Sequence, residues 1–474
     1  MSGGGRTIVP AVRIFKHHIR TPFLALAGVE FLILAASIYA AAKIVFWSDF
    51  SEAYLYVGPL FPRAVIFATV MVIAMFAMGL YQADLREGLP GILLRVSISF
   101  ILGIITLAVI FYVYPGIKFG RGIMGAAVFV GYLGVSFARA IFLHTIDSNA
   151  LRKRVLVLGA GKKAAAFLQL RRRSDQRGFH IVGFVHITGE ANHVDPARII
   201  HLDRPLPDKC RELEIDEIIV AVDDRRKNFP IEELLDCKLY GIDVLDALSF
   251  FERETGKIML QLLSPSWLIF SEGFRKGTAR AYAERVFDVS MSLALLAITW
   301  PLMLVTALAI AIESGWRAPI LYRQVRVGAN GRPFQLLKFR SMRPDAEQDG
   351  AKWAQKNDSR VTRVGAVIRK FRIDELPQLY NILRGDMSFV GPRPERPEFV
   401  RQLSECISYY DERHRVKPGL AGWAQLRYPY GSSVEDAAEK LQYDLYYVKN
   451  HSLLLDLLIL IQTAEVVLFG KGAR

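Results

Sequence analysis

Four long apolar segments dominate the first third of the chain. They lie at about residues 23–47, 60–82, 92–114 and 122–146. Each is close to the ~20 residues that a helix needs to cross ~30 Å of hydrocarbon. A cleaved signal peptide would account for the first segment alone, but that segment is too long and three more follow it. The pattern therefore predicts a bundle of four transmembrane helices within residues 1–150.

Basic residues predict that both ends of this region lie in the cytoplasm. Those at the two ends are Arg6, Arg13, Lys16 and Arg20 before the first segment, and Arg152, Lys153 and Arg154 after the fourth. Lys118 and Arg121, in an outer loop, go against this orientation. Glu30 and Lys43 lie within the first segment and are candidates for a transport function. Because the four segments contain so few polar groups, a membrane anchor is favoured.

Residues 151–270 have the pattern of a soluble α/β domain. Apolar runs at 154–161, 180–186, 217–222 and 241–245 alternate with helical segments such as 163–173 and 231–239. Such alternation favours a parallel sheet covered by helices, which is a Rossmann-like fold.

Gly159 and Gly161 follow the first strand of this domain, where a glycine turn can approach a pyrophosphate. The acid that binds ribose should end the second strand, but only Glu190 lies near that point. A Tyr-x-x-x-Lys pair for proton transfer occurs only at Tyr39 and Lys43, inside the first membrane segment. A regulatory or scaffolding domain is therefore favoured over one that uses a nicotinamide cofactor, and no cofactor-binding residue is assigned beyond the weak candidates Gly159 and Gly161.

A fifth apolar run, residues 289–312, has Pro301 at its centre. One interpretation is a fifth transmembrane helix. However, arginines occur on both sides of the run, at Arg280, Arg285, Arg317, Arg323 and Arg326. Because both flanks look cytoplasmic and a central proline can bend a helix, we favour a re-entrant helix at about residues 286–312. It enters one leaflet and returns.

Several motifs for phosphate chemistry follow within residues 271–474. They are Lys338-Phe-Arg-Ser-Met342, Arg372-Ile-Asp-Glu-Leu-Pro-Gln-Leu-Tyr-Asn381, Gly385–Glu395 and Lys417–Gln425. Each has an ordinary explanation when taken alone. Asp374 and Glu375 are typical of a helix start, Lys338 and Arg340 of a solvated strand, and Pro392–Pro394 of a rigid turn.

Together, in this order and spacing, the motifs resemble the bacterial sugar transferase family. These are the polyprenyl-phosphate sugar-1-phosphate transferases (monotopic phosphoglycosyl transferases) that begin exopolysaccharide and O-antigen synthesis. The stretches KFRSM, DELPQLYNILRGDMSFVGPRP and KPGLAGWAQ carry the resemblance over roughly the last 200 residues. The four apolar segments and the α/β domain are similar to the long form of the family. Trp300 stands where the family often has a small residue before the proline.

The resemblance implies transfer of a sugar-1-phosphate from a UDP-sugar to undecaprenyl phosphate, with release of UMP and with Mg²⁺ as cofactor. It also implies a multi-pass protein of the bacterial inner membrane, a cytoplasmic α/β catalytic domain and a possible homodimer. The sugar is not determined. A membrane-tethered nucleotide-sugar oxidoreductase or epimerase and an inactive scaffold of a polysaccharide assembly complex are the alternatives.

The same resemblance assigns catalysis and metal binding to Asp374 and Glu375. It assigns substrate binding to Lys338, Arg340, Arg372, Asp386, Pro392, Arg393, Pro394, Glu395 and Lys417. Asp374 at a helix N-terminus would meet backbone N–H groups and could act as a nucleophile that forms an acyl phosphate. Arg393 has a planar fork suited to phosphate, stiffened by its prolines. Lys338 and Arg340 alternate with Phe339 and should share one face of a strand.

The composition of the chain agrees with a membrane region followed by a domain that binds phosphates. The chain of 474 residues is 52% hydrophobic with a net charge of +14, which suits anionic membrane surfaces and phosphates. Nucleic acid is not expected, because much of the charge flanks membrane segments or phosphate motifs. Three scattered cysteines without a CxxC motif argue against a zinc site or a disulfide framework. The final stretch, Ser452–Gly470, predicts an amphipathic helix that lies at the membrane interface or packs on the core.

Overall fold

The computed structural model describes most of the chain, divided into two compact units, Met1–Leu245 and Asp246–Arg474. The described residues are 11–14, 17–47, 58–81, 89–118, 120–145, 152–169, 179–224, 226, 228–271, 273–274, 277–344, 360–428, 431 and 433–469. The second unit begins 25 residues before the boundary at 270/271 that the sequence suggested. Residues 246–270 join it because they bond to its helices: Ile258 N donates to Gln442 O at 3.0 Å, for example.

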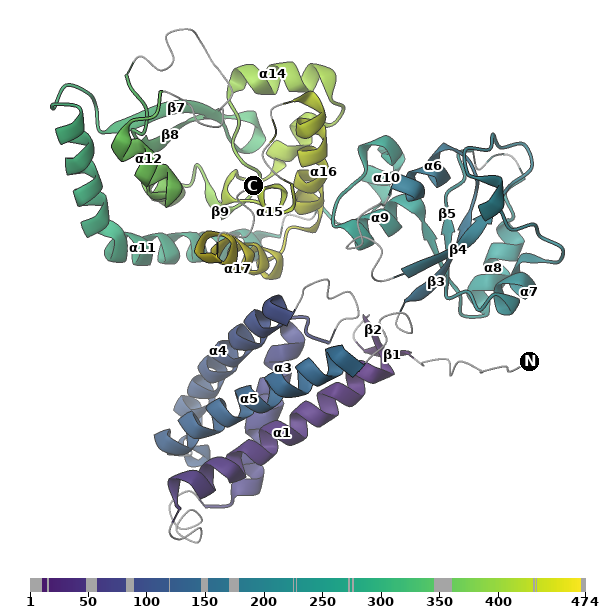
Figure 1. The fold of residues 1–474 in the computed structure, drawn as a ribbon, viewed down its shortest axis with the longest axis horizontal. Helices are drawn as coiled ribbons and strands as arrows, with labels where there is room; N and C mark the ends of the chain where they lie inside the picture. The colour runs from purple at the N-terminus through teal and green to yellow at the C-terminus, as the bar shows by residue number, and fades with distance from the viewer. Residues whose placement is uncertain are drawn as a thin grey trace. The chain divides into compact units, whose positions relative to one another are not determined.

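Four long helices follow a short hairpin at the start of the first unit. The hairpin is β1 (Ala11–Ile14) with β2 (His17–Arg20), and the helices are α1 (Thr21–Val45), α3 (Leu60–Ala77), α4 (Leu89–Val113) and α5 (Arg121–Thr145). Helices α1 and α4 each pack against both α3 and α5 (Figure 1). All four are long and apolar enough to cross a membrane, as the sequence predicted.

Glu30 forms a buried ion pair with Arg139 inside this group of helices. Arg139 approaches the carboxylate with Nε at 2.7 Å and donates from a terminal nitrogen at 2.9 Å. The Tyr81 hydroxyl donates to the same carboxylate at 2.5 Å. Because Arg139 compensates the charge of Glu30 and both hydrogen bonds go to its Oε2, this carboxylate ties α1 to α5. Lys43 is exposed. Both observations favour an anchor over a transporter.

A four-stranded sheet forms the rest of the first unit, with the strand order β4-β3-β5-β6. The strands are β3 (Lys153–Leu158), β4 (Phe179–Val185), β5 (Glu217–Val220) and β6 (Asp243–Asp246). β3 is parallel to both β4 and β5. Helices α7 (Leu206–Glu212) and α8 (Ile231–Leu239) bury Cys210 and Cys237 against the sheet. The predicted helix 163–173 is seen as a short α6 (Lys162–Ala165) and a 3₁₀ turn (Ala166–Gln169), and its end lies outside the described residues.

The second unit surrounds two small sheets with helices. A hairpin of β7 (Leu321–Val327) and β8 (Pro333–Phe339) is antiparallel, whereas β9 (Ser388–Val390) and β10 (Gly419–Ala421) are parallel. The helices are α9 (Ala247–Thr255), α10 (Pro265–Phe270), α12 (Arg363–Lys370), α13 (Gln378–Arg384), α14 (Pro397–Cys406), α15 (Trp423–Arg427), α16 (Val434–Asn450) and α17 (Leu453–Phe469). In α17, Ile459 is fully buried, while Leu453 is 47% exposed. One face of this terminal helix therefore packs on the core.

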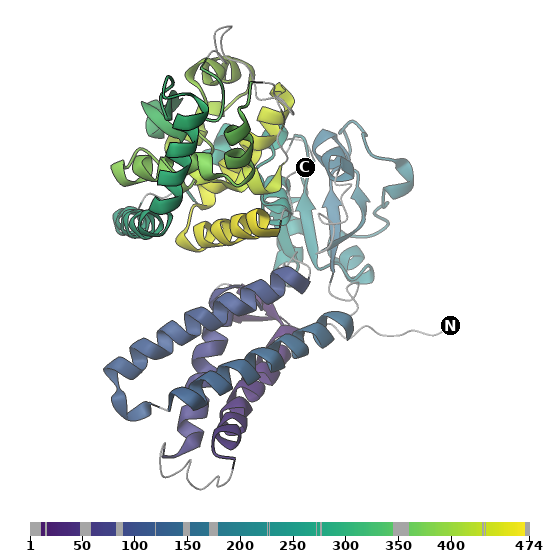
Figure 2. The ribbon, with the colours of Figure 1, turned by 60° about the vertical axis from the view of Figure 1, so that its left-hand side comes forward.

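Helix α11 (Thr278–Glu313) has 36 residues and contains Pro301. A straight helix of this length would extend about 54 Å, well beyond ~30 Å of hydrocarbon. Figures 1 and 2 show instead that α11 turns sharply part of the way along. A proline removes a helical hydrogen bond and clashes with the preceding turn, which explains such a bend.

The two limbs of α11 pack on the same compact unit. In the first limb, Arg285 donates to Ile382 O at 2.7 Å, and the Asp288 carboxylate accepts from Phe389 N at 3.2 Å. In the second limb, Ile310 packs with Phe339 of β8 and Ile368 of α12. Between these contacts, apolar side chains near the proline are exposed, including Ile298 at 74% and Val305 at 62%.

Candidate active site

Asp374 and Glu375 lie in a 3₁₀ turn, Ile373–Glu375, that connects α12 to α13. Both are buried, with exposures of 8% and 7%. The expected position of Asp374 at the N-terminus of an α-helix is wrong, because α13 begins only at Gln378, after Pro377. The backbone before Gln378 forms 3₁₀ hydrogen bonds instead: Glu375 N donates to Arg372 O at 3.2 Å, and Leu376 N donates to Ile373 O at 3.1 Å. The turn starts from Arg372, whose left-handed φ of 60° is unusual for a residue with a side chain.

Glu375 gathers three cations from three different segments. Its Oε1 lies 3.2 Å from a terminal nitrogen of Arg393 and 3.4 Å from both Lys338 Nζ and a terminal nitrogen of Arg372. Burial alone would raise the pKa of Glu375, but Arg393, Lys338 and Arg372 outweigh it and lower that pKa to about 2. Glu375 therefore stays ionised and fixes the positions of the cations around it.

Asp374 is in a different electrostatic state. Burial and then the neighbouring charge of Glu375 raise its pKa, while Lys338 and Arg372 work in the opposite direction. Its Oδ1 is buried and has no hydrogen-bond partner among the described residues. A buried acceptor is normally paired, so this oxygen is available for a ligand, a metal or a reacting atom.

Lys338 reaches Glu375 from strand β8. Asn381 of α13 holds that strand from the side, since its Oδ1 accepts from Leu337 N at 3.0 Å and its Nδ2 donates to Gln335 O at 2.7 Å. Burial, partly offset by Glu375, lowers the pKa of Lys338 to about 8. No role for Asn381 was predicted from the sequence. Its side-chain amide can both accept from an N–H and donate to a C=O, which allows it to bond to the backbone of a strand edge.

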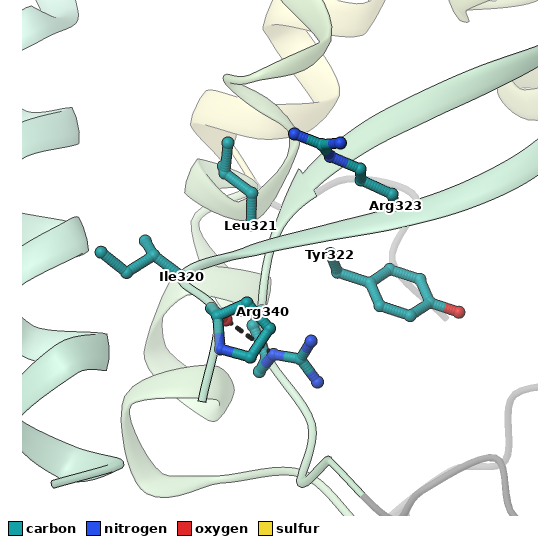
Figure 3. Close-up of a pocket in the computed structure, with 6 residues that line it drawn as sticks. Ile320, Leu321, Tyr322, Arg323 and Arg340 are labelled. Carbon is teal, nitrogen blue, oxygen red and sulfur yellow. Dashed lines mark hydrogen bonds between the residues drawn. The ribbon is translucent and has the colours of Figure 1, made fainter. Parts of the chain in front are cut away.

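Arg340 lies on the same face of the hairpin as Lys338, as the alternation predicted. Lys338 pairs with Tyr322 across the hairpin, and the guanidinium of Arg340 lies 5.9 Å from the centre of the Tyr322 ring. Arg340 also donates to Pro319 O at 2.8 Å. Arg340, Tyr322 and Pro319 line a surface pocket of about 580 Å³ together with Ile320, Leu321 and Arg323 (Figure 3). Arg340 thus belongs to a pocket that is separate from the cluster around Glu375. None of the three cations that contact Glu375 lines this pocket.

The loop Pro392–Glu395 brings Arg393 to Glu375. The loop follows β9, where a Cβ on Gly391 would collide with Lys417 O and would lie 2.8 Å from Gly419 N. Only glycine allows this close approach of the two motifs. Glu395 pairs with Arg326 of β7 at 3.5 Å.

Two predicted site residues have other neighbours. Asp386 lies beyond the far end of α13, where Arg384 approaches it at 3.5 Å. Lys417 interacts electrostatically with Glu284 and Asp288 of α11. Asp386 and Lys417 therefore lie outside the central cluster of the site. That cluster consists of Asp374, Glu375, Lys338, Arg372 and Arg393.

The carboxylates fit a magnesium ion only if a substrate completes its coordination. Among the described residues, no group of three or more His, Cys, Asp or Glu side chains could hold a metal. Asp374 supplies one unpaired oxygen, whereas Oε1 of Glu375 already contacts three cations. Mg²⁺ is commonly held by one or two carboxylates together with substrate phosphates, so this donor set is compatible with it.

In the first unit, the glycine turn is filled by the protein's own carboxylates. Asp223 accepts from Lys162 N at 2.8 Å and from Lys163 N at 2.9 Å, and Glu190 accepts from Ala160 N at 2.9 Å. A Cβ on Gly161 would collide with both carboxylates. These backbone donors are the groups that would bind a pyrophosphate in a dinucleotide-binding domain.

Comparisons with known proteins agree with this division of the chain. Residues 279–470 match the family described as bacterial sugar transferase, and residues 76–228 match one described as a CoA-binding domain. Over 393 residues, the chain is 31% identical to the undecaprenyl-phosphate glucose phosphotransferase of Komagataeibacter xylinus, covering 76% of this chain and 72% of that protein.

Two further relatives have related names. The UDP-glucose:undecaprenyl-phosphate glucose-1-phosphate transferase of Klebsiella pneumoniae is 31% identical over 71% of this chain and 72% of its own length. The UDP-N-acetylgalactosamine-undecaprenyl-phosphate N-acetylgalactosaminephosphotransferase of Aeromonas hydrophila is 43% identical over 50% of this chain. The chain spans 55% of the length of the Aeromonas protein.

Proposed function

The chain belongs to the bacterial sugar transferase family, and we propose that it transfers a sugar-1-phosphate from a UDP-sugar to undecaprenyl phosphate. The products are UMP and a polyprenyl-diphosphate-linked sugar, which begins the synthesis of a polysaccharide. The names of the relatives support this substrate class but differ in the sugar, which is glucose or N-acetylgalactosamine.

The observation that carries the proposal is the unpaired, buried Oδ1 of Asp374 beside the cations held by Glu375. A nucleophile needs a free electron pair, and a sugar diphosphate needs positive charge close by. Arg393 and Lys338 supply that charge at fixed positions.

In the proposed reaction, an oxygen of Asp374 attacks the phosphorus that carries the sugar. The bond from this phosphorus to the bridging oxygen breaks, and UMP leaves with the electron pair. An oxygen of undecaprenyl phosphate then attacks the same phosphorus and breaks the acyl phosphate, which regenerates the carboxylate. Two steps avoid bringing two anionic phosphates together at once. Bound Mg²⁺, held by Asp374 and the substrate's phosphates, would offset negative charge.

The membrane arrangement is part of the proposal. Helices α1, α3, α4 and α5 cross the inner membrane as an anchor, while α11 enters one leaflet and returns. Contact of both limbs of α11 with one compact unit supports this, as does the exposed apolar surface around Pro301. The catalytic unit is then cytoplasmic, on the side of the UDP-sugar. Resemblance to the long family form further supports a homodimer.

The test is release of UMP when the purified protein is mixed with undecaprenyl phosphate and each of several UDP-sugars. Asp374→Asn keeps the shape but removes the nucleophile, so turnover should stop while UDP-sugar binding remains measurable. Asp411→Asn, at a side chain that is 72% exposed, is the matched control and should stay active.

Mass spectrometry of protein mixed with UDP-sugar alone should find a sugar-phosphate adduct on Asp374. An adduct on another residue would contradict the mechanism. Strict ternary-complex kinetics would show that Asp374 has only a metal-binding or structural role.

A further inference from the structure

The loop that carries Arg393 is fixed through four consecutive carbonyl groups. Pro392 O accepts from Gly419 N at 3.0 Å, and Glu395 O accepts from Val327 N at 2.9 Å. Between them, Arg393 O accepts from Arg413 at 3.0 Å and Pro394 O accepts from Arg326 at 3.0 Å. Because prolines have no N–H, this loop has few donors of its own and is held mainly by its acceptors.

Arg413 is the most deeply buried of the side chains that hold the loop. It lies in the 3₁₀ turn Tyr410–Arg415 and is 6% exposed. Its guanidinium pairs with Asp444 of α16 at 2.8 Å and donates to the Tyr410 hydroxyl at 2.7 Å. Nearby acidic groups and Tyr410 outweigh the effect of burial and raise the pKa of Arg413, so it stays charged.

These contacts separate the roles of two arginines. Arg393 is partly exposed and directs its guanidinium to Glu375, so it can contact a substrate. Arg413 is enclosed and its charge is balanced by Asp444, so it is poorly placed to bind a phosphate. What Arg413 contacts is the backbone of Arg393.

We propose that Arg413 is a positioning residue, which holds the carbonyl of Arg393 so that the Arg393 guanidinium lies beside Glu375 and meets the sugar phosphate. The inference rests on the proposed function, because it assumes that Arg393 binds a reacting phosphate. This role requires a planar guanidinium, whose separate nitrogens bond to Asp444, Tyr410 and Arg393 O in different directions. The single ammonium nitrogen of a lysine cannot reproduce this geometry.

The test is Arg413→Lys in the full-length protein, which keeps a positive charge beside Asp444 but loses the fork. Small displacements of reacting groups can cost about 100-fold in rate, so we expect kcat for UMP release to fall by about 10- to 100-fold while KM for the UDP-sugar changes little. The lost hydrogen bonds of this buried side chain should lower the unfolding temperature, but the variant should remain folded at the temperature of the assay. Arg415→Lys is the matched control: Arg415 lies in the same turn, is 62% exposed and contacts Glu412, and its replacement should leave kcat unchanged.

A double-mutant cycle with Arg393→Lys distinguishes positioning from a general effect on folding. If Arg413 acts through Arg393, the double variant should be about as slow as Arg393→Lys alone. Independent, multiplying losses would overturn the proposal, as would an Arg413→Lys variant with the kcat of the wild type. A wild-type protein that releases no UMP would instead contradict the proposed function itself.

Discussion

Glu375 and Arg393 form an ion pair of 3.2 Å between two motifs that are 18 positions apart in the chain. The pair joins the turn that carries Asp374 to the proline-flanked loop. It also distinguishes the two acids. Glu375 organises cations, while the unpaired oxygen of Asp374 remains available.

Replacing Glu375 by Gln should affect both activity and stability. The variant leaves Lys338, Arg372 and Arg393 without their shared counter-charge, and removal of one partner from a buried pair costs about 3–5 kcal/mol. We expect a clearly lower unfolding temperature and a severe loss of turnover. Glu398→Gln is the control, because Glu398 is 60% exposed and lies 3.7 Å from Arg396, where such pairs contribute about 1 kcal/mol or less. Equal unfolding temperatures for the two variants would contradict the organising role of Glu375.

The path of α11 through the membrane is tested with cysteine labelling. Thr278→Cys places a thiol at the first residue of the helix and Arg323→Cys places one after it. A Cys406→Ser background is used, because Cys406 is exposed whereas Cys210 and Cys237 are buried. If α11 is re-entrant, both thiols should be protected from an impermeant reagent outside the cell and labelled after permeabilisation. Labelling at position 323 alone would indicate a fifth transmembrane helix and an external catalytic unit.

The sequence predicted those parts of the fold that depend on local pattern. The apolar helices, the strands beginning near Arg154, and α8 at Ile231–Leu239 follow from periodicity and glycine turns. The motif residues around Asp374 were found from their order along the chain. The predicted helix start at Asp374 was wrong because Ile373–Glu375 form a 3₁₀ turn and α13 begins only at Gln378.

What the sequence did not predict depends on contacts between distant segments. Asp223 accepts a hydrogen bond from the amide of Lys162, which lies 61 positions earlier in the chain. Asp444, in another helix, forms an ion pair with Arg413. Neither partner belongs to a motif or to a periodic pattern. The grouping of residues 246–270 with the second unit depends on such contacts too, since their pattern alone reads as part of the preceding α/β domain.

The filled glycine turn predicts that the α/β domain binds neither NADH nor coenzyme A. Calorimetry on the wild-type protein should detect no saturable binding of either molecule, because the Ala160, Lys162 and Lys163 amides are occupied. Asp223→Asn should lower stability by about 1 kcal/mol, because an amide has one acceptor oxygen for the two N–H groups of Lys162 and Lys163. The neighbouring exposed Asp224→Asn serves for comparison. Saturable binding of coenzyme A to the wild type would refute the interpretation.

Contacts made by residues 246–270 predict which shortened chain is the more stable. Trp423 Nε1 donates to Gly256 O at 2.7 Å, and Lys449 pairs with Glu252 at 2.6 Å. A truncated chain of residues 246–474 keeps these bonds, whereas one of residues 271–474 loses them. In detergent, the longer chain should unfold at a higher temperature and retain more transferase activity. If the two chains are equally stable, residues 246–270 contribute nothing to this unit.

Acid should destabilise the protein through His414, which lies beside the Arg393 loop. Burial and then the charge of Arg413 lower its pKa from 6.5 to about 4. Between these values the unfolded chain binds a proton that the folded chain excludes, so stability falls as the pH decreases from 6.5 towards 4. The full effect is roughly 3 kcal/mol at 1.36 kcal/mol per pKa unit. His414→Gln removes the titrating group, so chemical denaturation at several pH values should give a shallower loss of stability than in the wild type. Arg415→Gln, which leaves the imidazole in place, should keep the steep dependence. A wild-type slope that His414→Gln leaves unchanged would mean that other groups cause the acid sensitivity.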